Sequence, residues 1–103
     1  MKEIVRRSIK QLNDLLPKEK KLEIKDTTIL VGEKSNLESI DLVNLFVNLE
    51  KNLKEEKKLT LTFDEIIQNI DQLKTIGALT VFLNNKLKKN EKKWYIYKYN
   101  FKF

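Results

Sequence analysis

Residues that break helices are almost absent from this chain, which has two glycines and one proline among 103 residues. An all-β fold of this size needs frequent turns, and glycine and proline are the strongest turn signals. Charged residues make up 35% of the chain and hydrophobic residues 41%, which suits a compact helical bundle with a well-solvated surface. A chain of this length has room for one domain with one modest core. The sequence therefore predicts an all-α fold.

Residues 3–16 are predicted to form the first amphipathic helix. Its apolar positions recur at three- and four-residue spacing, namely Val5, Ile9, Leu12 and Leu16. Leu15 is expected to widen this stripe. Pro17 ends the helix, because the residue before a proline is pushed out of helical geometry. A long polar connection over 18–36 follows, and its apolar patch 28–31 is expected to tuck into the core as loop or to form a short strand.

Residues 39–54 give the clearest helical pattern. One continuous stripe consists of Leu42, Leu45, Phe46, Leu49 and Leu53. A second apolar edge consists of Ile40, Val43 and Val47. A surface helix needs only one such stripe. Apolar residues that remain exposed beside charged ones often mark a docking surface, so the second edge is a candidate for one, with burial in the core as the alternative.

Two further helices are predicted from their caps. Thr62 and Glu65 match a capping box and should start a short helix. Thr75 is placed to cap a last helix, whose final turn would contain Lys86 and two further lysines that complement the helix dipole. The expected fold is a four-helix bundle with three longer helices, one short helix and a long first loop.

The domain is assigned to residues 1–90, and residues 91–103 form a basic aromatic C-terminal tail. Aromatic residues occupy every second position near the end, at Tyr95, Tyr97, Tyr99, Phe101 and Phe103. Alternation of this kind is typical of a strand. We expect the tail to fold over the bundle or to join the edge of a partner's sheet. Contact with single-stranded nucleic acid or with a membrane interface is the less favoured interpretation.

Composition excludes several kinds of site. The chain contains neither cysteine nor histidine, so disulfides, Cys/His zinc sites and a Ser-His-Asp arrangement are all excluded. The N-terminal segment is charged throughout, unlike a signal peptide, and no stretch reaches the length of a membrane span. We therefore expect a cytoplasmic protein. If it handles a thioester, the sulfur must come from an attached group, because the chain has no cysteine.

The net charge of +6 is unevenly distributed. Residues 26–50 contain five carboxylates against one lysine, a local charge of −4. The positive charge lies in 18–25, 51–58 and 86–102. A basic protein invites a nucleic-acid interpretation, but the acidic centre makes a small nucleic-acid-binding protein the weakest of the hypotheses.

The segment from Leu37 to Leu45 resembles the signature of the acyl carrier protein family, Asp-Ser-Leu-(Asp/Glu)-x-Val-Glu-Leu. Ser39 falls on the serine that this family modifies, Glu38 on the preceding acid and Ile40 on the following leucine. The segment from Leu73 to Leu83 is similar to the family's last helix. The resemblance covers roughly residues 3–88. The chain departs from the family pattern in having Glu38 where the family usually has Asp, and asparagine at two positions that are commonly acidic. The Gly-Gly-x-Ser form that is usual in peptidyl carriers is absent, which favours an acyl carrier over a peptidyl carrier.

The resemblance implies an acyl-carrier-like bundle whose Ser39 bears covalent 4′-phosphopantetheine. It implies a carrier rather than an enzyme, in fatty-acid, polyketide or other acyl metabolism, with a monomeric chain. Its partners would be a phosphopantetheinyl transferase and acyl-loading and acyl-transfer enzymes. The docking surface would comprise Glu38, Ile40, Asp41, Val43, Val47 and Glu50. No metal site and no nucleic-acid partner are expected, and the leucine-rich stripe would line a cleft for the acyl chain.

Two alternatives remain at the level of sequence. Ser35 and Glu38 also match a capping box, so the helix could begin earlier, with Ser35 as its cap and Ser39 inside its first turn. The chain could also be a carrier-like interaction module whose serine is never modified.

Overall fold

The computed structural model describes the backbone of residues 1–100 and the side chains of residues 1–89. Its elements follow in the order α1 (Lys2–Asn13), η1 (Lys18–Lys20), α2 (Ser39–Lys57), α3 (Phe63–Gln68), η2 (Ile70–Gln72) and α4 (Ile76–Asn100). Within the described residues the only extended pairing is an isolated antiparallel bridge between Ile29 and Thr75. The predicted all-α fold with three long helices and one short helix is confirmed.

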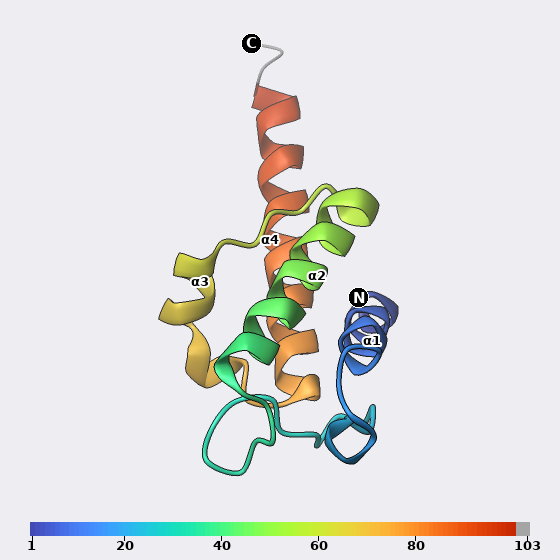
Figure 1. Cartoon of the computed structure of the whole chain (residues 1–103). Coiled ribbons are helices and arrows are strands. Elements are labelled where there is room, and N and C mark those ends of the chain that lie inside the picture. Colours follow the sequence, from blue (N-terminus) through green and yellow to red (C-terminus); the bar gives the residue numbers. More distant parts are fainter. Residues whose placement is uncertain (101–103) are drawn as a thin grey trace.

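Helix α2 lies between α1 on one side and α3 on the other, and α4 runs behind it (Figure 1). The core consists of apolar side chains from all four helices and from the connecting segments. Its fully buried members include Val5, Ile9 and Leu12 of α1, Leu45, Leu49 and Leu53 of α2, and Leu79 and Leu83 of α4. The inward stripes predicted from three- and four-residue spacing are therefore the faces that pack together.

The long first loop is tied to the start of α4. Leu30 donates its backbone N–H to the carbonyl of Lys74 at 2.7 Å, and Gly77 donates to the carbonyl of Asp26 at 2.9 Å. The Leu30 side chain is fully buried. The apolar patch 28–31 thus enters the core as loop with a single bridge, as one of the two sequence interpretations expected. These bonds hold the loop against the end of the bundle at which α4 begins, and α2 begins at the same end (Figure 1).

The expectation for Leu15 is wrong, because its side chain is 67% exposed. Helix α1 ends at Asn13, and beyond it the helical spacing that would have turned Leu15 inward no longer holds. Leu16 is buried nonetheless. It lies in the turn after α1, where its backbone carbonyl accepts a hydrogen bond from the ammonium group of Lys21 at 3.0 Å.

The strand expected in the C-terminal tail is also contradicted over the described residues. Helix α4 continues without a break to Asn100 and projects past the other helices (Figure 1). The stretch contains neither glycine nor proline, and extending an existing helix avoids the cost of nucleating a new one. Alternation alone therefore did not decide the structure. Residues 101–103, the end of the predicted tail, lie outside the described part.

A buried polar network joins α1 to α2. Asn52 donates to the Ser8 hydroxyl at 2.9 Å and to the side-chain oxygen of Gln11 at 3.1 Å, and Ser8 donates to the carbonyl of Ile4 at 2.9 Å. Since a buried polar group without a partner is costly, these bonds favour one register of α1 against α2.

Gly77→Ala should destabilise the fold. A Cβ at this position would lie 3.0 Å from the Asp26 carbonyl oxygen and 3.1 Å from the Asp26 Cβ. Overpacking of this kind costs about 1–3 kcal/mol, which exceeds the gain of about 1 kcal/mol from replacing glycine in a helix. We expect a net loss of about 1 kcal/mol in urea unfolding. The exposed Val81→Ala in the same helix is the control, and an equal loss there would contradict this explanation.

Asn52→Ala should lower the free energy of unfolding by about 1–3 kcal/mol, since the Ser8 hydroxyl loses its buried donor. The double variant Ser8→Ala with Asn52→Ala removes both partners together and should cost less than the sum of the two single changes. A double-mutant cycle by urea unfolding measures this coupling. Additive single effects would show that the network does not act as a unit.

Candidate functional site

Ser39 is the first residue of α2, and its side chain is exposed. Glu38 precedes it in extended conformation as the N-cap, and the Asp41 carboxylate accepts the Glu38 backbone N–H at 2.9 Å. The first helical hydrogen bond runs from Leu42 to the Glu38 carbonyl. The N–H groups of the first turn therefore lack helical partners, and such groups favour a nearby anion.

The alternative start of the helix at Ser35 is not adopted. The Ser35 hydroxyl donates to the carbonyl of Leu30 at 2.7 Å and accepts the backbone N–H of Leu37 at 3.1 Å. Ser35 therefore stabilises the loop that leads into α2. The helix begins four residues later, where the carrier-like pattern placed it.

Lys20 contacts the acid beside Ser39. Its ammonium group lies 3.2 Å from a carboxylate oxygen of Glu38, and both side chains are partly exposed. The two residues are far apart in the sequence, so no local pattern predicted this pair. Of the three acids expected to attract partners, Glu38 is thus paired with a lysine and Asp41 bonds the backbone, while Glu50 is exposed.

The second apolar edge of α2 faces outward. Ile40 is 60% exposed, Val43 39% and Val47 49%. Together with Glu50 they follow helical spacing along one side of the helix, which begins beside Ser39. Burial in the core, the alternative interpretation of these residues, is excluded. Of the predicted docking residues, the structure therefore brings Ile40, Val43, Val47 and Glu50 together on one side of α2, while Glu38 and Asp41 lie at its start.

The inner stripe of α2 is closely packed. Leu45, Leu49 and Leu53 are fully buried, and Phe46 is 4% exposed. Leu42, at the end near Ser39, is partly buried against this core. The sequence led us to expect that this stripe lines a cleft for an acyl chain. In the structure its residues are instead packed into the core.

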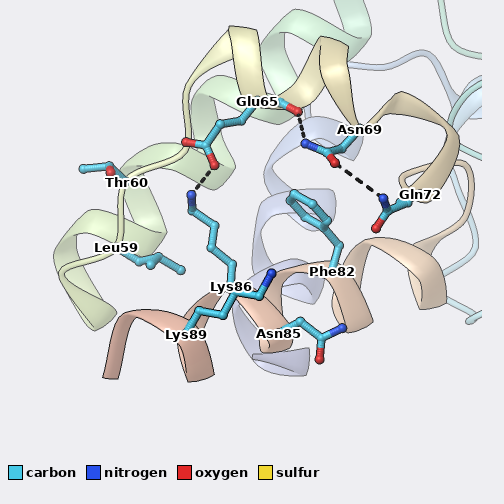
Figure 2. Close-up of a pocket in the computed structure, with 9 residues that line it drawn as sticks. All are labelled: Leu59, Thr60, Glu65, Asn69, Gln72, Phe82, Asn85, Lys86 and Lys89. Carbon is cyan, nitrogen blue, oxygen red and sulfur yellow. Dashed lines mark hydrogen bonds and ion pairs between the residues drawn. The ribbon is translucent and has the colours of Figure 1, made fainter. Parts of the chain in front are cut away.

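A hollow of about 460 Å³ lies instead between α3 and α4. Figure 2 shows Phe82 near its middle, facing the amide groups of Asn69 and Gln72. Asn69 donates to the Glu65 carbonyl at 2.8 Å, and Gln72 donates to the Asn69 side-chain oxygen at 3.4 Å. None of the sequence-predicted site residues lines this hollow.

An ion pair between Glu65 of α3 and Lys86 of α4 closes one side of the hollow (Figure 2). The hydrogen bond and charge of the Lys86 ammonium, helped by hydrogen bonds with Thr62 and opposed by burial, hold the pKa of Glu65 below its ordinary value. Glu65 also completes the capping box predicted with Thr62, whose hydroxyl accepts the Glu65 N–H at 3.2 Å. The sequence placed Lys86 in the last helical turn, which is wrong because α4 continues to Asn100.

Comparison with known proteins adds no family. The chain matches no protein-family model, no curated protein and no solved structure. Within the described residues, no helix is both long enough and apolar enough to cross a membrane. The same part of the chain contains no cluster of three or more carboxylates suited to a metal ion.

Glu65→Gln should reduce the acid sensitivity of the fold. A carboxyl whose folded-state pKa lies below its ordinary value of 4.5 adds stability that is fully present above that value and is lost as the pH falls through the lower, folded-state pKa. Between about pH 6 and pH 3 the variant should therefore lose less stability than the unmodified chain. Urea unfolding across this range provides the measurement.

The matched control for this change is the Lys86→Met background. With the ammonium removed, Glu65→Gln should have a much smaller further effect on the pH dependence. Identical acid profiles for the unmodified chain and Glu65→Gln would contradict the assigned role of the pair.

Proposed function

We propose that this protein is an acyl carrier whose Ser39 receives a 4′-phosphopantetheine arm. The observation that carries the proposal is the position of the Ser39 side chain, exposed on the first residue of α2. The resemblance of the Leu37–Leu45 segment to the carrier signature supplies the identity of the group. The fold order of helix, long loop, helix, short helix and helix supports the same proposal.

The loading step requires little from the carrier itself. The Ser39 oxygen forms a bond to the phosphorus that bears the pantetheine arm of coenzyme A, and the diphosphate bond breaks. The nucleotide half leaves, and the serine proton passes to a base of the transferase, which also binds Mg²⁺. The carrier has no histidine and supplies an accessible hydroxyl at a helix start, where N–H groups without helical partners favour the new phosphodiester.

The outward edge of α2 is the proposed contact for partner enzymes. Ile40, Val43 and Val47 would provide the apolar part of the contact, and the exposed Glu50 would attract basic groups at its far end. Glu38 and Asp41 have partners within the chain. We therefore propose that apolar contact contributes more to docking here than the acids do.

The protein so proposed acts as a monomer in the cytoplasm, in fatty-acid, polyketide or related acyl metabolism. It binds its acyl group as a thioester on the arm and passes it between enzymes. The packed inner stripe of α2 implies that a long acyl chain would enter the core only if the helices move apart.

Incubation with coenzyme A, Mg²⁺ and a broad-specificity phosphopantetheinyl transferase tests this function by intact mass. We expect the chain to gain one phosphopantetheine and Ser39→Ala to gain none. Ser35→Ala is the matched control and should be loaded like the unmodified chain, because its hydroxyl bonds the loop. If several transferases add nothing to the unmodified chain, the proposal fails and a carrier-like interaction module is favoured.

A further inference from the structure

The face of α4 that borders the hollow is more polar than bundle packing requires. Four residues of this face line the hollow, with Asn85 and Lys86 three and four residues after Phe82, and Lys89 three residues after Lys86. A helix face turned toward another helix of the same bundle is ordinarily apolar. Here only Phe82 packs against the core. The polar side chains leave a space where apolar ones would have closed it.

The opposite wall presents amide groups. Asn69 is held on both sides, by the Glu65 carbonyl and by Gln72. The Gln72 side-chain oxygen and the Asn85 amide have no hydrogen-bond partner among the described residues, and an amide offers both donors and an acceptor. The Phe82 ring lies between these amides (Figure 2). An aromatic face flanked by donors and acceptors suits a planar ring with polar edges, because the ring can stack while its edges form hydrogen bonds.

The charges of the hollow favour an anion. Two lysines and one glutamate line it. Glu65 pairs with Lys86, and no described carboxylate pairs with Lys89, which lies nearly one helical turn further along the same face. A negatively charged group near Lys89 would therefore meet an ammonium that Glu65 does not neutralise.

We propose that the hollow between α3 and α4 binds a mononucleotide, with its base against Phe82 and its phosphate toward Lys89. The volume of about 460 Å³ falls within the range of roughly 300–1,000 Å³ found for small-molecule sites. No residue of α2 lines the hollow. The site is thus distinct from Ser39, and its occupation does not depend on loading of the arm.

The test is titration of the isotope-labelled chain with the monophosphates of adenosine, guanosine, cytidine and uridine, followed by NMR. We expect saturable shifts at Phe82, Asn85 and Gln72 with at least one of the four. The matching nucleoside alone and inorganic phosphate alone should each bind more weakly, because each lacks half of the contacts. Ser39→Ala should bind as the unmodified chain does, which separates this result from the outcome of the loading experiment.

Lys89→Gln should weaken binding roughly three- to fivefold, as expected for one partly exposed charge contact. The matched control is Lys88→Gln, a neighbouring exposed lysine that does not line the hollow and should change the affinity little. Phe82→Leu should weaken binding on the order of tenfold through loss of stacking. Circular dichroism checks its fold, and if it unfolds, the comparison of Lys89→Gln with Lys88→Gln decides.

Three results would overturn the proposal. The first is the absence of saturable binding for all four nucleotides. The second is equal weakening by the Lys88 and Lys89 changes, which would indicate diffuse attraction to a basic protein. The third is inorganic phosphate binding as tightly as the best nucleotide, which would reduce the site to a simple anion contact.

Discussion

The packing of one face of α2 against α1 and α4 determines what the rest of the surface can do. Leu45, Leu49 and Leu53 are fully buried there, so the rotation of α2 about its axis is set by the core. With that rotation fixed, the second apolar edge can only face outward. The buried bonds of Asn52 to α1 fix the register of the same pair. The exposed edge of α2 and the serine at its start are thus consequences of core packing.

Those parts of the fold that rest on helical spacing or on a local cap could be predicted from the sequence. The start of α2 at Ser39, the capping box at Thr62 and the cap at Thr75, whose hydroxyl accepts the Ala78 N–H at 3.1 Å, all depend on residues within a few positions of each other. Predictions failed where a pattern was extended past the end of an element, as for Leu15, or where two patterns competed. In residues 91–100 the alternation of aromatics competed with uninterrupted helix-forming sequence, and the helix prevailed over the described range.

The contacts that sequence could not provide are those between distant segments. The pair of Lys20 with Glu38 and the pair of Lys86 with Glu65 each join elements far apart in the chain. Glu65 was recognised only as a capping residue, and Lys86 only as a charge near a helix end. The two residues form an ion pair with each other, and this pair is recognised only when α3 is placed beside α4. The hollow between these helices could not be predicted for the same reason.

The distribution of charge in space differs from its distribution along the chain. The sequence shows a block of carboxylates around Ser39, which suggests an acidic surface for basic partners. In the folded chain Lys20 is brought to Glu38, and Asp41 is turned to the backbone of its own helix. Exposed ion pairs of this kind contribute little to stability, but they do reduce the field that a partner meets at a distance. Around Ser39 the apolar edge of α2 therefore stands out more than the sequence indicated, and recognition there would depend on close fit more than on long-range attraction.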